Sequence, residues 1–451
     1  MKLIYDVGDK PKFGANLAFA IQQLLAIMAA TLVVPVIINS QTNSTMSPAA
    51  ALFGAGIGTL VYVLFTKAKS PVFLGSSFAF LGSMAAAFAG GVSMSLGFLG
   101  LIIGAVFAGL VYVVIALIVH FVGVEWINRL MPAVVIGPTV SIIGLSLAGN
   151  AISDLTKAPA GGNYLIAILC GLVTLFVTML CSTYGRKTAR LIPFIIGILA
   201  GYAVAAIFTG IGRATGCEAL LVTDFSAFES LVENGVGLKT FLQIPDFTFF
   251  TAIKGTGELT GAYVGAIAVA YIPVAFVVFA EHIADHKNIS SIIERDLLKE
   301  PGLSRTLLGD GVGSMAGALF GGCPNTTYGE SIGCVAITGN ASVYTIITAA
   351  ICAIVIAFIS PFVAFVNTIP SCVMGGVCIA LYGFIAVSGL KMVQQVDLNE
   401  NRNLFVVSTI LIAGIGGLTL TFGKVSITNI ATALILGILA NIILGKRRKK
   451  N

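Results

Sequence analysis

The sequence predicts an all-α integral membrane protein whose fourteen transmembrane segments form a seven-plus-seven inverted repeat. Composition gives the first indication, because 57% of the 451 residues are hydrophobic and only 10% are charged, whereas soluble domains carry roughly 25% charged residues. The second is the recurrence of apolar runs near the length of about 20 residues that spans a bilayer. The third is the uneven distribution of Lys and Arg between successive loops. A water-soluble protein is therefore excluded.

Eleven stretches are apolar and continuous enough to predict complete transmembrane helices. They cover residues 14–38, 48–66, 98–122, 131–149, 163–184, 191–210, 260–284, 343–366, 370–390, 403–421 and 427–445. Three weaker segments, 71–90, 303–321 and 323–339, are apolar enough to lie at membrane depth, but Gly, Pro, Ser or Asn residues interrupt them. Together these stretches give the expected count of fourteen.

The distribution of positive charge supports this count, because Lys and Arg collect in cytoplasmic loops. With a cytoplasmic N-terminus, 20 of the 25 Lys and Arg residues fall on the inner side. The five on the outer side are Lys157, Arg213, Lys239, Lys254 and Lys424. Omitting one weak segment would move later basic loops outside. We therefore expect a multi-pass protein of the cell membrane with both termini in the cytoplasm.

The long loop 211–257 is then external and divides the chain into two halves of seven segments. Because seven is odd, the second half enters from the opposite side, as in many secondary transporters. The third segment of each half, 71–90 and 323–339, is the interrupted one. Non-helical backbone at membrane depth must face protein or a water-filled cavity, so the two interruptions indicate one shared binding site. Two re-entrant loops without a ligand are the alternative.

Both interrupted segments change from an extended to a helical pattern, at Pro71–Phe78 and at Pro324–Glu330. We expect each segment to contain non-helical backbone followed by a helix start. The first backbone N–H groups of a helix lack intrahelical partners and lie at the positive end of its dipole. These helix starts are therefore candidate sites for carbonyl oxygens or anions.

Four carboxylates lie at the expected membrane depth, Glu281, Asp285, Asp310 and Glu330. A charged carboxylate at the centre of a membrane helix costs about 2.5–3.5 kcal/mol and usually has a function. Each also has a structural explanation. Glu281 could end its helix at the membrane interface, Glu330 could complement a helix dipole, and Asp310 could serve packing or capping. Asp285 and His286 could belong to a solvated helix end.

Metal and cofactor chemistry are not expected. His120, His282 and His286 are few and dispersed, and the eight Cys residues form no C-x-x-C pair. Neither a nucleophile with a base nor a metal cluster is apparent at one depth, so an integral membrane enzyme is disfavoured. The net charge of +6 follows from the basic cytoplasmic loops and needs no nucleic-acid partner.

Four motifs carry a resemblance to a known family. They are Gly75-Ser-Ser-Phe-Ala-Phe80, Ala280-Glu-His-Ile283, Glu294-Arg-Asp-Leu-Leu-Lys-Glu-Pro-Gly302 and Pro324-Asn-Thr-Thr-Tyr-Gly-Glu-Ser-Ile-Gly333. With them, nearly the whole chain resembles the uracil permease branch of the nucleobase/ascorbate transporter family. The resemblance implies nucleobase:proton symport and a fold with short strands in the third and tenth spans.

The resemblance also implies two domains, each built from both halves of the chain. A core would hold spans 1–4 in residues 1–122 and spans 8–11 in residues 258–366. A gate would hold spans 5–7 with the external loop in residues 123–257, and spans 12–14 with the basic tail in residues 367–451. The family further implies a homodimer formed through the gate.

The resemblance assigns a set of substrate-binding residues. Glu281 and Glu330 would contact the base, the backbone amides of Phe78 and Gly329 would donate to it, and Tyr328 and Tyr382 would line the pocket. Uracil offers two ring N–H donors and two carbonyl acceptors, which two carboxylates and two amides pair completely. A site that satisfies every polar group of its ligand discriminates against analogues lacking one.

Proton coupling is expected from Asp285, His286 or Asp310. Uracil permeases of this type usually carry His four residues after the glutamate, where this chain has Asp285. Asp285 shares a helix face with Glu281, whereas His286 is expected to point toward the cytoplasmic surface. Because an Asp at this place is more typical of xanthine and urate carriers, a purine:proton symporter is the nearest alternative to uracil import. A passive channel is a more distant one.

Overall fold

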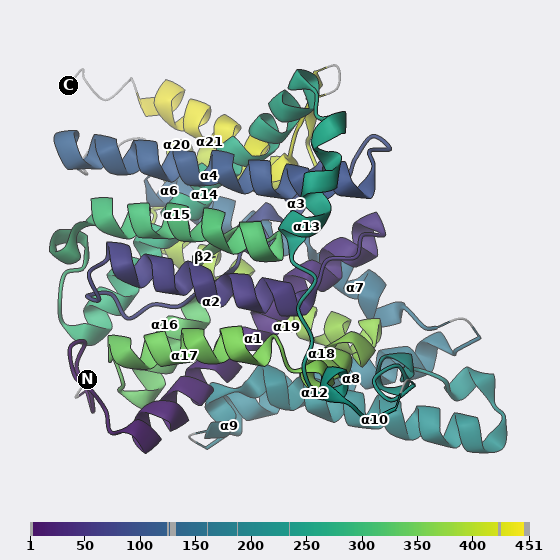
Figure 1. Ribbon diagram of the computed structural model, residues 1–451. Coiled ribbons are helices and arrows are strands. Elements are labelled where there is room, and N and C mark those ends of the chain that lie inside the picture. The colour runs from purple at the N-terminus through teal and green to yellow at the C-terminus, as the bar shows by residue number, and fades with distance from the viewer. Residues whose placement is uncertain are drawn as a thin grey trace.

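The computed structural model describes residues 3–123, 126, 132–159, 161–186, 188–233, 235–422 and 425–445. It is a mostly helical bundle in which the long helices run roughly side by side (Figure 1). Eight helices are long and apolar enough to cross a membrane, counted over the described residues. The start of α1 and the end of α21 lie at the same end of the bundle, on the left in Figure 1.

The first half of the chain begins with two long helices and an interrupted segment. These elements are α1 (Phe13–Thr42), α2 (Pro48–Phe65), β1 (Leu74–Ser76), η1 (Phe78–Phe80), α3 (Leu81–Ala87) and α4 (Met94–Val122). They are followed by α6 (Ala133–Ser146), α7 (Ala148–Thr156), α8 (Tyr164–Tyr184), α9 (Thr188–Leu191) and α10 (Pro193–Thr215). In the loop expected to be external, the described residues form short helices, η2 (Glu218–Leu220), α11 (Ser226–Glu229), α12 (Leu238–Phe241), α13 (Thr248–Ala252) and η3 (Ile253–Glu258).

The second half opens with the longest described helix. Its elements are α14 (Gly261–Ile293), η4 (Leu298–Gly302), α15 (Leu303–Gly321), β2 (Asn325–Thr327), α16 (Gly329–Thr338), α17 (Val343–Ile356) and α18 (Ser360–Thr368). The chain ends with α19 (Ser371–Val393), α20 (Asn401–Ile415), β3 (Leu420–Phe422), β4 (Val425–Ile427) and α21 (Asn429–Gly445). Polar caps start several of the long helices; Thr260, for example, accepts a hydrogen bond from the Tyr263 amide at the start of α14.

Two of the expected helices are broken within their apolar runs, and a third, expected over 260–284, continues to Ile293. The stretch 343–366 is two helices, because Pro361 lies at the start of α18, where its missing N–H is tolerated but a continuous helix is not. The stretch 403–421 ends as a helix at Ile415, and β3 and β4 then pair as an antiparallel hairpin that the sequence reading did not anticipate. In both cases an apolar run conceals a break in the backbone.

The two interrupted segments meet in the middle of the bundle. Strands β1 and β2 pair antiparallel, with Leu74 opposite Thr327 and Ser76 opposite Asn325. The Gly75 position requires glycine, since a Cβ there would lie 2.4 Å from the Tyr328 ring. Each strand leads directly into a helix, β1 into η1 and α3 and β2 into α16. The strand pair therefore brings the two helix starts close together.

The long helices pack as two groups. In one group, α15 packs against α2 and α4, α14 against α4, and α17 against α1 and α2. In the other, α19 packs against α6 and α8, α10 against α8, and α20 against α6 and α21. Contacts between the groups are fewer and involve mainly α1, α14 and α16 on the side of the first group.

Two ion pairs join loops at the end of the bundle where α2 and α14 finish. Lys69 donates to Glu300, and Arg295 donates to Asp6. The hydrogen bond and charge of Lys69 hold the pKa of the Glu300 carboxyl below its usual value. Since exposed pairs contribute little stability, their effect is to tie the loop after α2 and the N-terminal segment to the connection between α14 and α15.

Glycines let α2 and α15 pack backbone against backbone. A Cβ at Gly54 would lie 2.4 Å from the Gly317 carbonyl oxygen, and one at Gly58 would lie 2.8 Å from that of Gly313. Contacts this short force the helices apart. Small residues at such crossings are the usual way in which membrane helices pack closely.

We expect Gly54→Ala to destabilise the protein by about 1–3 kcal/mol, because the added methyl overpacks this crossing. The thermal unfolding midpoint of the detergent-purified protein measures the effect. Gly265→Ala is the matched control, because it adds the same methyl to the exposed side of a long helix where no atom lies within 4 Å. Equal midpoints for the two variants would contradict the packing argument.

Candidate functional site

A cavity of about 350 Å³ lies between the two helix groups. The first group contributes Ala26, Glu281, Ala284, Asp285, Gly329, Glu330, Gly333, Cys334 and Ile337. The second contributes Val140, Arg190, Pro193, Phe194, Leu381, Phe384, Ile385, Ser388 and Met392. Its volume suits a small ligand. Because both helix groups line it, a movement of one group against the other would change its shape.

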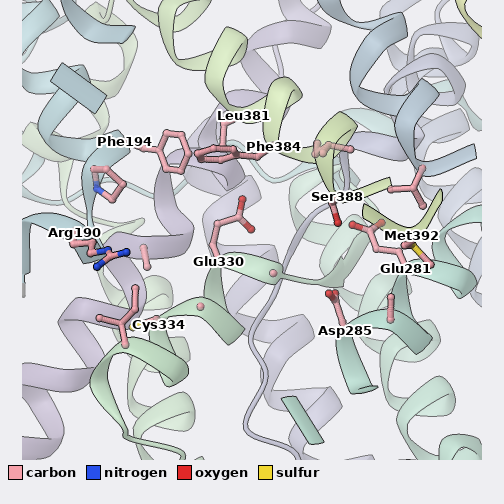
Figure 2. Close-up of a pocket in the computed structure, with 18 residues that line it drawn as sticks. Arg190, Phe194, Glu281, Asp285, Glu330, Cys334, Leu381, Phe384, Ser388 and Met392 are labelled. Carbon is pink, nitrogen blue, oxygen red and sulfur yellow. The ribbon is translucent and has the colours of Figure 1, made fainter. Parts of the chain in front are cut away.

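Three carboxylates face this cavity. Glu281 and Asp285 lie one turn apart on α14, and Glu330 is the second residue of α16. Figure 2 shows Glu330 near the centre, with Arg190 and Phe194 on one side and Glu281, Asp285 and Ser388 on the other. The carboxylates thus surround a space in which a ligand with several N–H donors would find acceptors.

The geometry around Glu330 follows from the strand that precedes it. Because β2 ends at Thr327 and the α16 helix begins at Gly329, the unpaired amides of the first turn lie at the cavity wall. The Tyr328 amide is already used, donating to the Phe73 carbonyl (3.2 Å). Gly329 itself lines the cavity, so its backbone is within reach of a ligand.

Tyr328 and Tyr382, which were expected to line the pocket, do not line the cavity, and neither does the ring of Phe78, of which only the backbone amide was expected to contact the base. The Tyr328 hydroxyl donates to the Ser76 carbonyl (2.6 Å) and braces one strand against the other. The rings of Phe78 and Tyr382 meet edge to face, with centroids 5.8 Å apart, where α19 approaches the first short helix. All three side chains are buried. The structure therefore assigns these side chains to packing beside the cavity.

Asp285 lies where the sequence predicted it, on the same face as Glu281. Its Oδ2 accepts a hydrogen bond from the Thr327 hydroxyl (2.7 Å), the last residue of β2. This contact links α14 directly to the strand pair. A change in the charge of Asp285 would therefore alter a hydrogen bond next to the start of α16, the helix that carries Glu330.

His286 does not point toward the surface, so that expectation is wrong. Its side chain is fully buried, with Nδ1 2.8 Å from the His282 carbonyl and Nε2 2.7 Å from the Tyr62 hydroxyl. The reason is the length of α14, which continues to Ile293 and packs this face inside the first helix group. The sequence predicts a helix end at residue 284, which would leave this position solvated.

Asp310 is also buried and does not line the cavity. Its Oδ2 lies 2.6 Å from Nδ1 of His282, whose Nε2 lies 3.0 Å from the Thr306 hydroxyl. The sequence alone suggests for His282 no role beyond that of a possible metal ligand, and its pairing with Asp310 is not predicted. The available signal was the i, i+4 spacing of His282 and His286, which places both imidazoles on one helix face.

Arg190 is a second site residue that the sequence does not predict. Its position indicates a basic residue on the cytoplasmic side, whereas the structure places its guanidinium at the cavity, on α9. Among the described residues, no group of three or more His, Cys, Asp and Glu side chains is arranged to hold a metal ion. The site is thus built from carboxylates, one cation and helix-start amides.

Comparison with known proteins shows which family this chain resembles. A model described as a permease family matches residues 14–422. The chain is 38% identical to the uracil permease of Bacillus caldolyticus, over 99% of this chain and 96% of that protein. It is 35% identical to the uracil permease of Bacillus subtilis, over 100% and 97%, and 33% identical to that of Escherichia coli K12, over 97% and 93%.

Solved structures of membrane transporters share the fold. The transmembrane domain of a cyanobacterial bicarbonate transporter, BicA, aligns with a TM-score of 0.62 at 14% identity, covering 97% of this chain and 100% of that domain. The murine anion transporter Slc26a9 aligns with a TM-score of 0.66 at 10% identity, covering 98% and 70%. The chain is thus a multi-pass membrane transporter rather than an enzyme, and it belongs to the nucleobase/ascorbate transporter family, where it groups with the uracil permeases.

Proposed function

We propose that this protein imports uracil together with a proton across the cell membrane. The observation that carries the proposal is the set of three carboxylates facing one cavity between two helix groups, in a chain 33–38% identical to uracil permeases. One charge crossing 100 mV provides about 2.3 kcal/mol, enough for roughly a 40-fold concentration gradient. A single proton is therefore a sufficient driving force.

In the proposed complex, Glu281 and Glu330 accept hydrogen bonds from the two ring N–H groups of uracil. The Gly329 amide donates to one carbonyl, and the Phe78 amide, at the start of the other short helix, donates to the second. Tyr328 and Tyr382 act through packing, by holding the strands and the Phe78 ring in place.

The proposed fold has fourteen spans in a seven-plus-seven inverted repeat, including the two interrupted spans with their paired strands. The first helix group corresponds to the core, residues 1–122 and 258–366, and the second to the gate, residues 123–257 and 367–451. The two-group packing supports this division. Alternating access would then be a movement of core against gate around the cavity, with two protomers joined through their gates and lipid around the exposed apolar side chains.

Asp285 is the proposed coupling group, while His286 and Asp310 hold buried positions behind it. Two carboxylates one turn apart resist double ionisation, so proton binding at Asp285 and substrate binding at Glu281 influence each other. The acidic residue at this position also favours a second candidate function, purine:proton symport. The substrate test must therefore include purines.

The decisive experiment is uptake of labelled uracil, xanthine and hypoxanthine by cells lacking their own permeases. We expect saturable uracil accumulation that collapses with a protonophore. Accumulation of xanthine instead of uracil would show that the protein is a purine symporter. Equilibration without accumulation would indicate a channel.

In the same assay, Glu281→Gln and Glu330→Gln should each lose most uracil binding, because a hydrogen bond to a charged group contributes about 1.5–3 kcal/mol. That range corresponds to roughly a 10- to 100-fold weaker affinity. Glu233→Gln, an exposed residue of the external loop, is the matched control. Wild-type affinity in both cavity variants would refute the assignment.

Asp285→Asn should abolish gradient-driven accumulation while preserving counterflow exchange of uracil, because the amide cannot release a proton. Proteoliposomes with an imposed pH gradient separate the two activities. Asp246→Asn, at an exposed position, controls for the chemical change. Undiminished accumulation by Asp285→Asn would remove this residue from the coupling step.

Orientation is testable by labelling single cysteines in a background free of the eight native ones. An impermeant maleimide applied to intact cells should label residue 235, in the proposed external loop, and should not reach residue 450, which lies outside the described residues. The reverse pattern would invert the proposed topology.

A further inference from the structure

We propose that Asp310 and His282 form a second proton-binding site, behind the cavity, in which Asp310 carries the proton in this conformation. For its role in transport this inference rests on the proposed symport function; for proton occupancy it does not. The site belongs to neither the cavity wall nor the motif residues expected to contact the base. Its partners come from two helices, α14 and α15, whose side chains meet at this point.

The position of the pair separates it from the substrate cavity. Glu281 and Asp285 line the cavity, whereas the neighbouring His282 and His286 point into the interior and are fully buried. Asp310, on α15, is fully buried as well. One helix thus presents carboxylates to the cavity on one face and imidazoles to the core on another.

The hydrogens available on Thr306, His282 and Asp310 indicate which of these groups carries the proton. The Thr306 hydroxyl has a single hydrogen, and its oxygen lies 3.1 Å from the Leu303 carbonyl oxygen, which can only accept. When the hydrogen goes to Leu303, Nε2 of His282, 3.0 Å from the same hydroxyl oxygen, is the donor. In a neutral imidazole Nδ1 is consequently an acceptor, so the hydrogen in the 2.6 Å contact comes from Oδ2 of Asp310.

Two further observations favour a neutral Asp310 over an ion pair. Its other oxygen, Oδ1, is buried without a hydrogen-bond partner among the described residues. A carboxylate with an unpaired buried oxygen is costly, whereas the carbonyl oxygen of a protonated carboxyl is much less so. No described Lys or Arg bonds to the pair, and a bare carboxylate there would leave a net negative charge in the interior.

The site can also release its proton while both ring nitrogens of His282 stay hydrogen-bonded. The Asp310 proton moves to Nδ1, the Nε2 proton leaves to water, and the Thr306 hydroxyl rotates from the Leu303 carbonyl to Nε2. The unloaded pair is then a carboxylate bonded to Nδ1–H. Both states keep every ring nitrogen bonded, which is what a reversible proton site requires.

Neighbouring groups hold the His282 ring in this orientation. The His286 ring stacks on it with centroids 4.0 Å apart, and Tyr112 approaches its edge at 6.1 Å. Tyr62 on α2, Tyr112 on α4 and His286 on α14 are the titratable groups beside the pair. Glu281 and Asp285, on the cavity face of α14, interact with Asp310 through their charges. Because the ring cannot turn freely, a shift of α14 against α15 would change the Asp310–His282 contact directly.

Infrared spectra of the full-length protein in lipid, recorded without uracil and compared between each variant and the wild type, test whether Asp310 carries a proton. A protonated carboxyl has a C=O stretch distinct from that of a carboxylate. We expect one such band to be lost in Asp310→Asn and to shift in frequency in His282→Gln, but to remain unchanged in Asp285→Asn and Asp246→Asn. An unaltered set of bands in folded Asp310→Asn would overturn the proposal.

If Asp310→Asn does not fold, Thr306→Val decides the question, because it removes the hydroxyl that fixes the tautomer while nearly preserving shape. A shift of the same band supports the proposal, and an unshifted spectrum overturns it. Neither result depends on whether uracil is the substrate, so failure here and failure of the uptake experiment are distinguishable.

The transport consequence is measured in proteoliposomes. Asp310→Asn mimics the loaded site, since its amide donates to Nδ1, and should retain counterflow exchange but lose accumulation under an imposed pH gradient. His282→Gln should shift the pH profile of uptake without changing the concentration of uracil that half-saturates exchange. Gradient-driven accumulation by folded Asp310→Asn equal to that of the wild type would remove the pair from the coupling pathway.

Discussion

Backbone hydrogen bonding at membrane depth is the constraint on which the rest of the structure depends. Extended chain inside a bundle of membrane helices leaves N–H and C=O groups without water to satisfy them. Here each short strand solves the problem for the other, because β1 and β2 pair through three residues apiece. The pairing places two helix starts side by side, and Glu330, Gly329 and the Thr327 contact to Asp285 all take their positions from it.

Much of this architecture is readable from the sequence. Long apolar runs fix most of the helices, and Pro324 and Asn325 mark one of the interruptions. What the sequence conceals is the break within a uniformly apolar run, as before Pro361 and in the β3–β4 hairpin. Hydropathy alone does not record whether the backbone bends, so such breaks are found only from the tertiary packing.

The polar residues of α14 show that the sequence also does not predict which side chains are buried. Glu281, His282, Asp285 and His286 form a short polar cluster in which the sequence distinguishes no inside from outside. The carboxylates were correctly expected at a shared face. The imidazoles were not, because their burial depends on α15 and α2, which supply Asp310, Thr306 and Tyr62. Partners from distant segments decided the environment of each residue.

The length of α14 has a consequence for how membrane voltage acts on the site. A helix of 33 residues is about 50 Å long, well beyond the roughly 30 Å hydrocarbon core, and Asp285 lies in its last three turns. In the proposed orientation the cavity, with Arg190 in its wall, is therefore close to the cytosol. In that orientation the greater part of the membrane thickness, and with it most of the electric field, lies between the cavity and the outer face. Voltage would accordingly act on the return of the empty carrier and on loading from outside, and hardly at all on the release of substrate and proton into the cytosol.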